Sequence, residues 1–166
     1  MSSEELAQIW ESIISEARSL AEGEPMLASF FHATLLKHDD LGSALSYMLA
    51  NKLANPIMPA IAIREIVEEA YRKDPSMILS AARDIAAVSQ RDPEVDKYSI
   101  PLLYMKGFHA LHAYRIGNWL WGAGRRYLVV YPHNEIAVSC GVCFHPAETI
   151  ACGHISARAT GLESRS

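Results

Sequence analysis

The chain has 166 residues, half of them hydrophobic, with a net charge of −4 and a pI near 6.0. This length fits one domain, or one domain and the start of another. No basic block is present, so nucleic acid and anionic membranes are poor partners. No apolar run approaches the roughly 18 residues of a membrane span, and the acidic amino terminus does not resemble a signal peptide. The three cysteines lie between Cys140 and Cys152 and form no disulfide framework, which predicts a cytoplasmic protein.

Five amphipathic helices are predicted before residue 91. The first is capped by Ser2 or Ser3 and ends at Gly23, with apolar residues recurring at helical spacing. The second opens at Pro25, and its inward side chains are predicted to be Met26, Leu27, Phe30, Phe31 and Leu35.

The next three helices are bounded by proline signals. The third covers about 43–53 and is stopped by Asn55-Pro56, because a residue before proline disfavours helix. The fourth starts at Pro59. The fifth is capped at Asp74-Pro75 and runs through Val88, with proline at its first helical position.

Residues 91–121 predict one further helix. Ser99 can cap it, and its first turn tolerates Pro101. Its inward face is predicted to carry Tyr104, Phe108, Leu111, Ile116, Trp119 and Leu120. His109 and His112, three residues apart, could ligate a metal, but packing is the favoured interpretation for both.

The pattern changes after residue 126. Residues 127–131, YLVVY, fit either a last helical turn or a short strand. Apolar positions then recur every six residues, as in a left-handed parallel β-helix; they are Val138, Phe144, Ile150, Ser156 and Leu162. The predicted fold is therefore mainly α, with a multi-helix domain over 1–126 followed by the incomplete start of a β-helix over 127–166.

Four segments carry a family resemblance: EPMLASFFHATLLKH, RDPEVDKYS, PLLYMKGFHALHAYRIGNWLW and VCFHPAETIACG. The first three resemble the amino-terminal domain of bacterial serine O-acetyltransferases, and the fourth is similar to that family's first hexapeptide coils. The resemblance implies transfer of an acetyl group from acetyl-CoA to the hydroxyl of L-serine, toward cysteine. It also implies hexamers built as dimers of β-helix trimers, and hence self-association through the helical domain.

The resemblance also assigns site positions. It implies that Asp92 holds the amino-acid substrate or the inhibitor cysteine. The family's catalytic histidine corresponds to Arg158, which cannot act as a base at neutral pH, and its aspartate partner corresponds to Cys143. We therefore expect no retained catalytic residue and, at best, weak binding of L-serine or L-cysteine.

The last part of the family pattern has no counterpart before Ser166. Most of the acetyl-CoA site and the tail that docks into cysteine synthase belong to that part. The chain is accordingly expected to be a truncated member, without tightly bound cofactor and without cysteine synthase as partner.

The residues leave two alternative functions open. One is a small zinc protein, because thiolates and imidazoles at short spacing are zinc ligands; the candidate ligands are Cys140, Cys143, Cys152, His145 and His154. The other is a non-catalytic oligomerisation module. Trp10, Trp119 and Trp121 are interpreted as core or interface residues.

Overall fold

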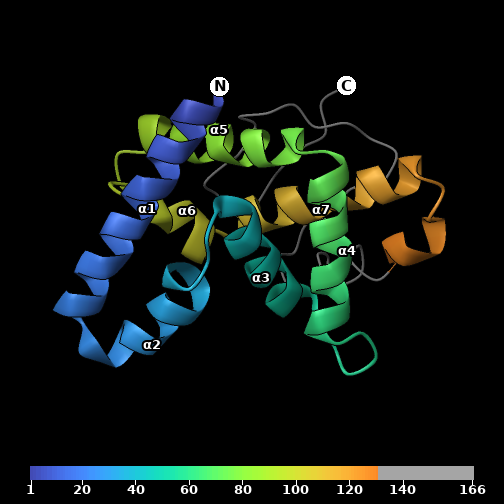
Figure 1. Ribbon diagram of the computed structural model, residues 1–166, viewed down its shortest axis with the longest axis horizontal. Helices are drawn as coiled ribbons and strands as arrows, with labels where there is room; N and C mark the ends of the chain where they lie inside the picture. Colours follow the sequence, from blue (N-terminus) through green and yellow to red (C-terminus); the bar gives the residue numbers. More distant parts are fainter. Residues whose placement is uncertain (131–166) are drawn as a thin grey trace.

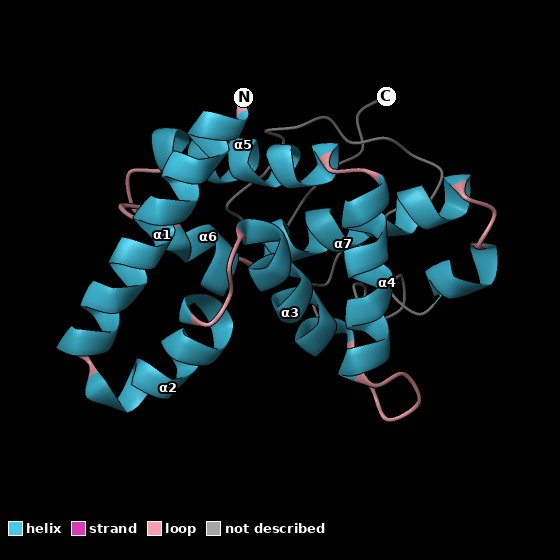
Figure 2. Cartoon of the chain, in the orientation of Figure 1, coloured by secondary structure: helices cyan, strands magenta, loops and turns pink. Residues whose placement is uncertain are grey.

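The structure is a computed structural model that describes residues 1–130, and these residues are almost wholly helical (Figure 1, Figure 2). No strand occurs within this described range, so the predicted multi-helix domain is confirmed there. The predicted start of the β-helix lies outside the described residues. Within residues 1–130, no helix is long and apolar enough to cross a membrane.

Helix α1 spans Ser3–Gly23 and begins with a capping box. The Ser2 hydroxyl accepts from the backbone N–H of Glu5 at 3.2 Å, and the Glu5 carboxylate accepts from the Ser2 N–H. Two orphan donors of the first turn are thereby satisfied. The predicted cap is confirmed at Ser2, and the buried face of α1 consists of Ile9, Ile13 and Ala17.

The predicted second helix is three short turns of different pitch. A 3₁₀ turn covers Pro25–Leu27, α2 covers Ala28–Phe31, and a π-helical turn covers His32–Leu36. Because the pitch changes twice, the apolar residues do not share one face. Phe31 and Leu35 are buried, but Met26 is 91% exposed, and Leu27 and Phe30 are exposed too, so the sequence prediction was wrong for these three.

Helices α3, Leu41–Leu53, and α4, Ala60–Lys73, pack against each other as an antiparallel hairpin (Figure 1). α3 begins two residues earlier than predicted, because Asp40 is its cap and accepts from the Ser43 N–H at 2.7 Å. Helix α5, Ser76–Arg91, follows. The N-cap position is Pro75, one residue later than predicted, although the Asp74 side chain still accepts from the Ser76 N–H at 3.1 Å.

The helix predicted over 99–121 is broken in two. Helix α6 covers Ser99–Tyr104 and α7 covers Lys106–Gly122, with Met105 in an extended conformation between them. No proline or glycine marks residue 105. Because of the break, Tyr104 is 54% exposed rather than buried. Residues 126–130 are helical, which confirms the helical alternative for the start of the YLVVY stretch.

Helix α7 is the centre of the core. It contacts α4, α5 and α6, and it crosses behind α4 in Figure 1. Its buried residues surround most of its circumference, which explains why it lacks a polar face; they are Phe108, His109, Ala110, Leu111, His112, Ala113, Tyr114, Ile116, Gly117 and Leu120.

A buried ion pair joins α7 to α5. Arg115 Nη1 donates to Asp84 Oδ2, and His112 Nε2 lies 3.4 Å from the same oxygen. Asp84 is fully buried. Burial alone raises the pKa of its carboxyl, but the interactions with His112 and Arg115 outweigh burial and hold that pKa below its usual value. Asp84 is therefore a buried, paired carboxylate.

We predict that Asp84→Ala lowers the free energy of unfolding by about 3–5 kcal/mol, because Arg115 is left as an uncompensated buried charge. The matched control is Glu69→Ala, which removes the partner of Arg125 at 2.7 Å in a pair more than one third exposed. Its cost should be about 0–1 kcal/mol. Urea unfolding of both variants measures the difference, and equal costs would contradict the assigned role of Asp84.

Candidate functional site

Asp92 lies where α5 ends, at the start of a loop that leads to α6. Its backbone N–H donates to the Val88 carbonyl at 2.9 Å, which closes the last turn of α5. Its Oδ1 accepts from the Glu94 N–H at 3.0 Å. Among the described residues, Oδ2 has no hydrogen-bond partner. The half-buried carboxylate thus has a fixed orientation and unused capacity to accept hydrogen bonds.

The loop over 92–98 is anchored in its middle by Val95, which is buried and whose N–H donates to the Asp92 carbonyl at 3.0 Å. Next to it, Asp96 forms an exposed pair with Lys97 at 2.9 Å. The hydrogen bond from Lys97 lowers the pKa of Asp96. The ammonium group of Lys97 is thus paired with the carboxylate of Asp96.

The far end of this loop is held by Glu16 of α1. One Glu16 oxygen accepts from the Tyr98 N–H at 3.0 Å and the other from the Ser99 N–H at 2.8 Å. The prediction that Ser99 caps this helix was wrong. Ser99 is the first residue of α6, and its buried hydroxyl has no partner among the described residues. Sequence reasoning missed Glu16 because it lies 83 positions before Ser99, beyond any local capping signal.

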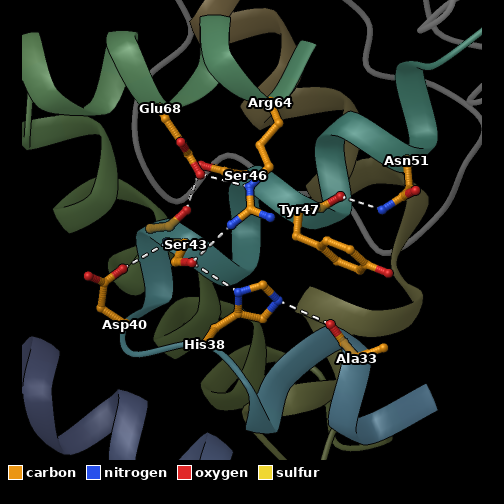
Figure 3. A network of polar contacts seen from close by, with 10 residues as sticks. Ala33, His38, Asp40, Ser43, Ser46, Tyr47, Asn51, Arg64 and Glu68 are labelled. Carbon is orange, nitrogen blue, oxygen red and sulfur yellow. Dashed lines mark hydrogen bonds and ion pairs between the residues drawn. The ribbon is translucent and has the colours of Figure 1, made fainter. Parts of the chain in front are cut away.

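A second polar network links the turn before α3 to α3 and α4 (Figure 3). His38 Nε2 lies 3.1 Å from the Ala33 carbonyl, and Nδ1 lies 2.9 Å from the Ser43 hydroxyl. Because a carbonyl only accepts, Nε2 carries the hydrogen and Nδ1 accepts from Ser43. Burial lowers the pKa of His38, which favours this neutral form.

The same network reaches α4 through Arg64. Its Nε donates to Glu68 at 2.7 Å, and its Nη2 lies 3.5 Å from the Ser43 hydroxyl (Figure 3). Ser43 is thereby engaged by an imidazole on one side and a guanidinium on the other. The arrangement ties three consecutive segments together and has the character of a structural network.

His109 and His112 pack inside the core, as favoured from the sequence. His109 Nε2 donates to the Leu102 carbonyl at 2.6 Å, and the His112 ring lies 4.3 Å from that of Phe108. Burial lowers the pKa of His109 to about 4. Within residues 1–130, no group of three or more His, Cys, Asp or Glu side chains is placed to hold a metal ion.

The three tryptophans also occupy structural positions. Trp10 Nε1 donates to the Asp39 carbonyl at 3.0 Å and so links α1 to the turn before α3. Trp119 and Trp121 are partly buried and pack against the core. This agrees with the core alternative of their interpretation as core or interface residues.

The remaining sequence-predicted site residues lie outside the described range, so the structure places none of them. They are the position of the family base and its partner, together with the candidate zinc ligands: Arg158, Cys143, Cys140, Cys152, His145 and His154. Of the residues that the family resemblance assigns to the site, Asp92 alone falls within residues 1–130.

A small apolar hollow of about 20 Å³ lies between α3, α4 and α7. It is lined by Leu53, Met58, Ile63, Ile66, Val67, Ile116, Leu120 and Leu128. This volume holds about one water molecule, and an apolar lining offers water no partners. The hollow therefore has no room for an organic ligand.

The fold and the site define an all-helical domain that presents one oriented carboxylate at a helix end. A family model described as "Serine acetyltransferase, N-terminal" matches residues 9–113. The chain belongs to this family.

Comparison with individual relatives gives the same family. The serine acetyltransferase of Salmonella typhimurium strain LT2 is 66% identical over 162 residues, which is 98% of this chain and 59% of the relative. A solved serine acetyltransferase in complex with cysteine has a TM-score of 0.87 at 58% identity, covering 89% of this chain and 61% of that one. A solved complex with CoA has the same TM-score and identity and covers 89% and 63%. The chain thus spans about three fifths of the length of these relatives.

We predict that stability decreases on acidification, in part through His109. Its folded pKa of about 4 lies below the unfolded value near 6.5, so between these values the unfolded chain binds the additional proton. Through His109 alone, the free energy of unfolding should therefore fall by about 2 kcal/mol between pH 7 and pH 5. His109→Gln, which can donate the same hydrogen bond but does not titrate, should reduce this decrease.

The control is His32→Gln, since His32 is exposed. Urea unfolding at pH 7 and pH 5 compares the parent with both variants. The parent and His32→Gln should lose stability alike, and His109→Gln should lose less. An identical loss in the parent and His109→Gln would exclude His109 as a source of the pH dependence.

Proposed function

We propose that residues 1–130 act as the amino-terminal domain of a serine acetyltransferase, in which Asp92 binds the ammonium group of L-serine or L-cysteine. The whole reaction would transfer the acetyl group of acetyl-CoA to the serine hydroxyl. The family match supports the domain assignment, and the solved relatives with cysteine and with CoA support these ligand classes. The observation that carries the proposal is the oriented carboxylate of Asp92 with its unused Oδ2.

The chemistry of Asp92 suits this role. An amino acid presents an ammonium group with three N–H donors, and a carboxylate is its natural partner in a charge-assisted hydrogen bond. Because Glu94 orients Oδ1, little rotational freedom is lost when Oδ2 accepts a further donor.

We also propose that copies of the chain associate through their helices and that the protein is cytoplasmic. Exposed apolar side chains support association, since they mark interaction surfaces when they gather; Met26, Leu27, Phe30 and Tyr104 are among them. The rings of Phe30 and Tyr104 stack at 6.4 Å between centroids, which brings exposed apolar side chains of α2 and α6 into contact. The cytoplasmic proposal rests on the absence of a disulfide framework in the sequence.

We predict that Asp92→Asn weakens binding of L-serine and L-cysteine. Asparagine keeps the shape but loses the charge, and a hydrogen bond to a charged group contributes about 1.5–3 kcal/mol, which corresponds to about 10–100-fold in Kd. Amide chemical-shift titration of the folded chain measures the affinity. The control is Asp96→Asn, which removes the same charge from the same loop; parent-like binding by Asp92→Asn would contradict the proposal.

We further predict slow acyl transfer by the 166-residue chain. Arg158 occupies the position of the family's base, and loss of a general base costs about 10²–10⁴-fold in rate. A thiol-release assay with acetyl-CoA and L-serine, run beside the Salmonella typhimurium relative, measures the difference. Serine-dependent CoA release at the rate of the relative would show that another residue of this chain supplies the base.

A further inference from the structure

We infer that Glu16 on α1 is the positioning residue for Asp92: its carboxylate fixes the far end of the loop whose first residue binds the amino acid. The inference rests on the proposed role of Asp92. Glu16 is 76 positions before Asp92 in the sequence and does not touch it in the structure as a hydrogen-bond partner. Its effect on Asp92 is therefore transmitted through the backbone of residues 92–98.

The contact has the form of a cap supplied from another helix. α6 has no side-chain cap of its own, so its first N–H groups need an acceptor from elsewhere. Glu16 uses one oxygen for Tyr98 and the other for Ser99. Its negative charge also lies at the positive end of α6. Because Ser99 is fully buried, water cannot readily replace the lost acceptor.

Glu16 is itself held firmly. Its neighbours Ile13 and Ala17 are both completely buried on the core face of α1, so the backbone from which Glu16 projects cannot shift without disturbing the core. α6 lies against α1 (Figure 1). The two hydrogen bonds that Glu16 accepts therefore fix the far end of the loop relative to the buried core.

The loop is short enough for one end to influence the other. Asp92 is attached to the end of α5, Val95 is buried, and Tyr98 and Ser99 are held by Glu16. Release of the far end leaves Val95 and local turn hydrogen bonds to keep the loop in place. The Glu94 N–H that orients the Asp92 carboxylate belongs to this same segment, so its position depends on the order of the loop.

The test compares Glu16→Ala and Glu16→Gln with Glu11→Ala, an exposed glutamate of the same helix. L-Cysteine is titrated into each folded chain, and the amide shifts are followed. Apparent Kd rises in proportion to the loss of the competent loop conformer, and we expect about a tenfold increase for Glu16→Ala. Glu16→Gln, whose amide oxygen can accept from one N–H, should lie between. Glu11→Ala should match the parent.

A double-mutant cycle separates positioning from general damage. If Glu16 acts through Asp92, then Glu16→Ala causes no further loss of L-cysteine affinity in an Asp92→Asn background. Additive losses would overturn the inference. Hydrogen exchange supplies a second readout, since Glu16→Ala should accelerate exchange at the Tyr98 and Ser99 amides while the amides of α7 keep their protection.

The outcomes distinguish the inference from the function on which it rests. Weak binding by Asp92→Asn with parent-like binding by Glu16→Ala overturns the inference alone. Parent-like binding by Asp92→Asn, or no L-cysteine-dependent shift in the parent, overturns the proposed role of Asp92 and this inference with it. Weak binding by both single variants without further loss in the double variant supports both.

Discussion

The buried pair of Asp84 and Arg115 is the constraint on which the arrangement of α5 and α7 depends. Asp84 has no exposure to solvent, so its charge is tolerable only while Arg115 and His112 face it. Close apolar packing already restricts how α5 and α7 can move, and a buried carboxylate and guanidinium add a directional requirement because their hydrogen bonds need a defined geometry. The rotation of α5 about its axis is thereby fixed relative to α7.

This constraint extends to the candidate site, because Asp92 ends the same helix. α5 determines where Asp92 begins the loop, and Glu16 of α1 determines where the loop ends. The loop that begins with Asp92 is therefore held at both ends, by α5 at its start and by α1 at its end. Such support by surrounding groups is what a binding residue on a loop requires.

On the proposed assignments, amino-acid binding and proton transfer belong to different parts of this chain. The domain that matches the family model contains the proposed amino-acid contact. From the family resemblance we propose that Arg158 and Cys143 stand at the positions of the family's base and its partner. Arginine keeps its proton at neutral pH and cysteine is a poor substitute for a carboxylate in orienting a histidine. On this proposal, the contact for the amino acid lies in the helical domain, and the substitutions fall on the residues of proton transfer.

The sequence by itself determined the helical class, most helix ends and the family, because caps, prolines and a 3.6-residue apolar period act within a few residues of each other. The cap at Ser2 and the burial of His109 were predictable in this way. Three features were decided only by the tertiary structure: the changes of pitch over 25–36, the break at Met105, and the cap that Glu16 places on α6. For the cap the physical reason is plain: Glu16 lies 82 and 83 positions before the two N–H groups that it satisfies, and local sequence patterns carry no record of partners so far away in the chain.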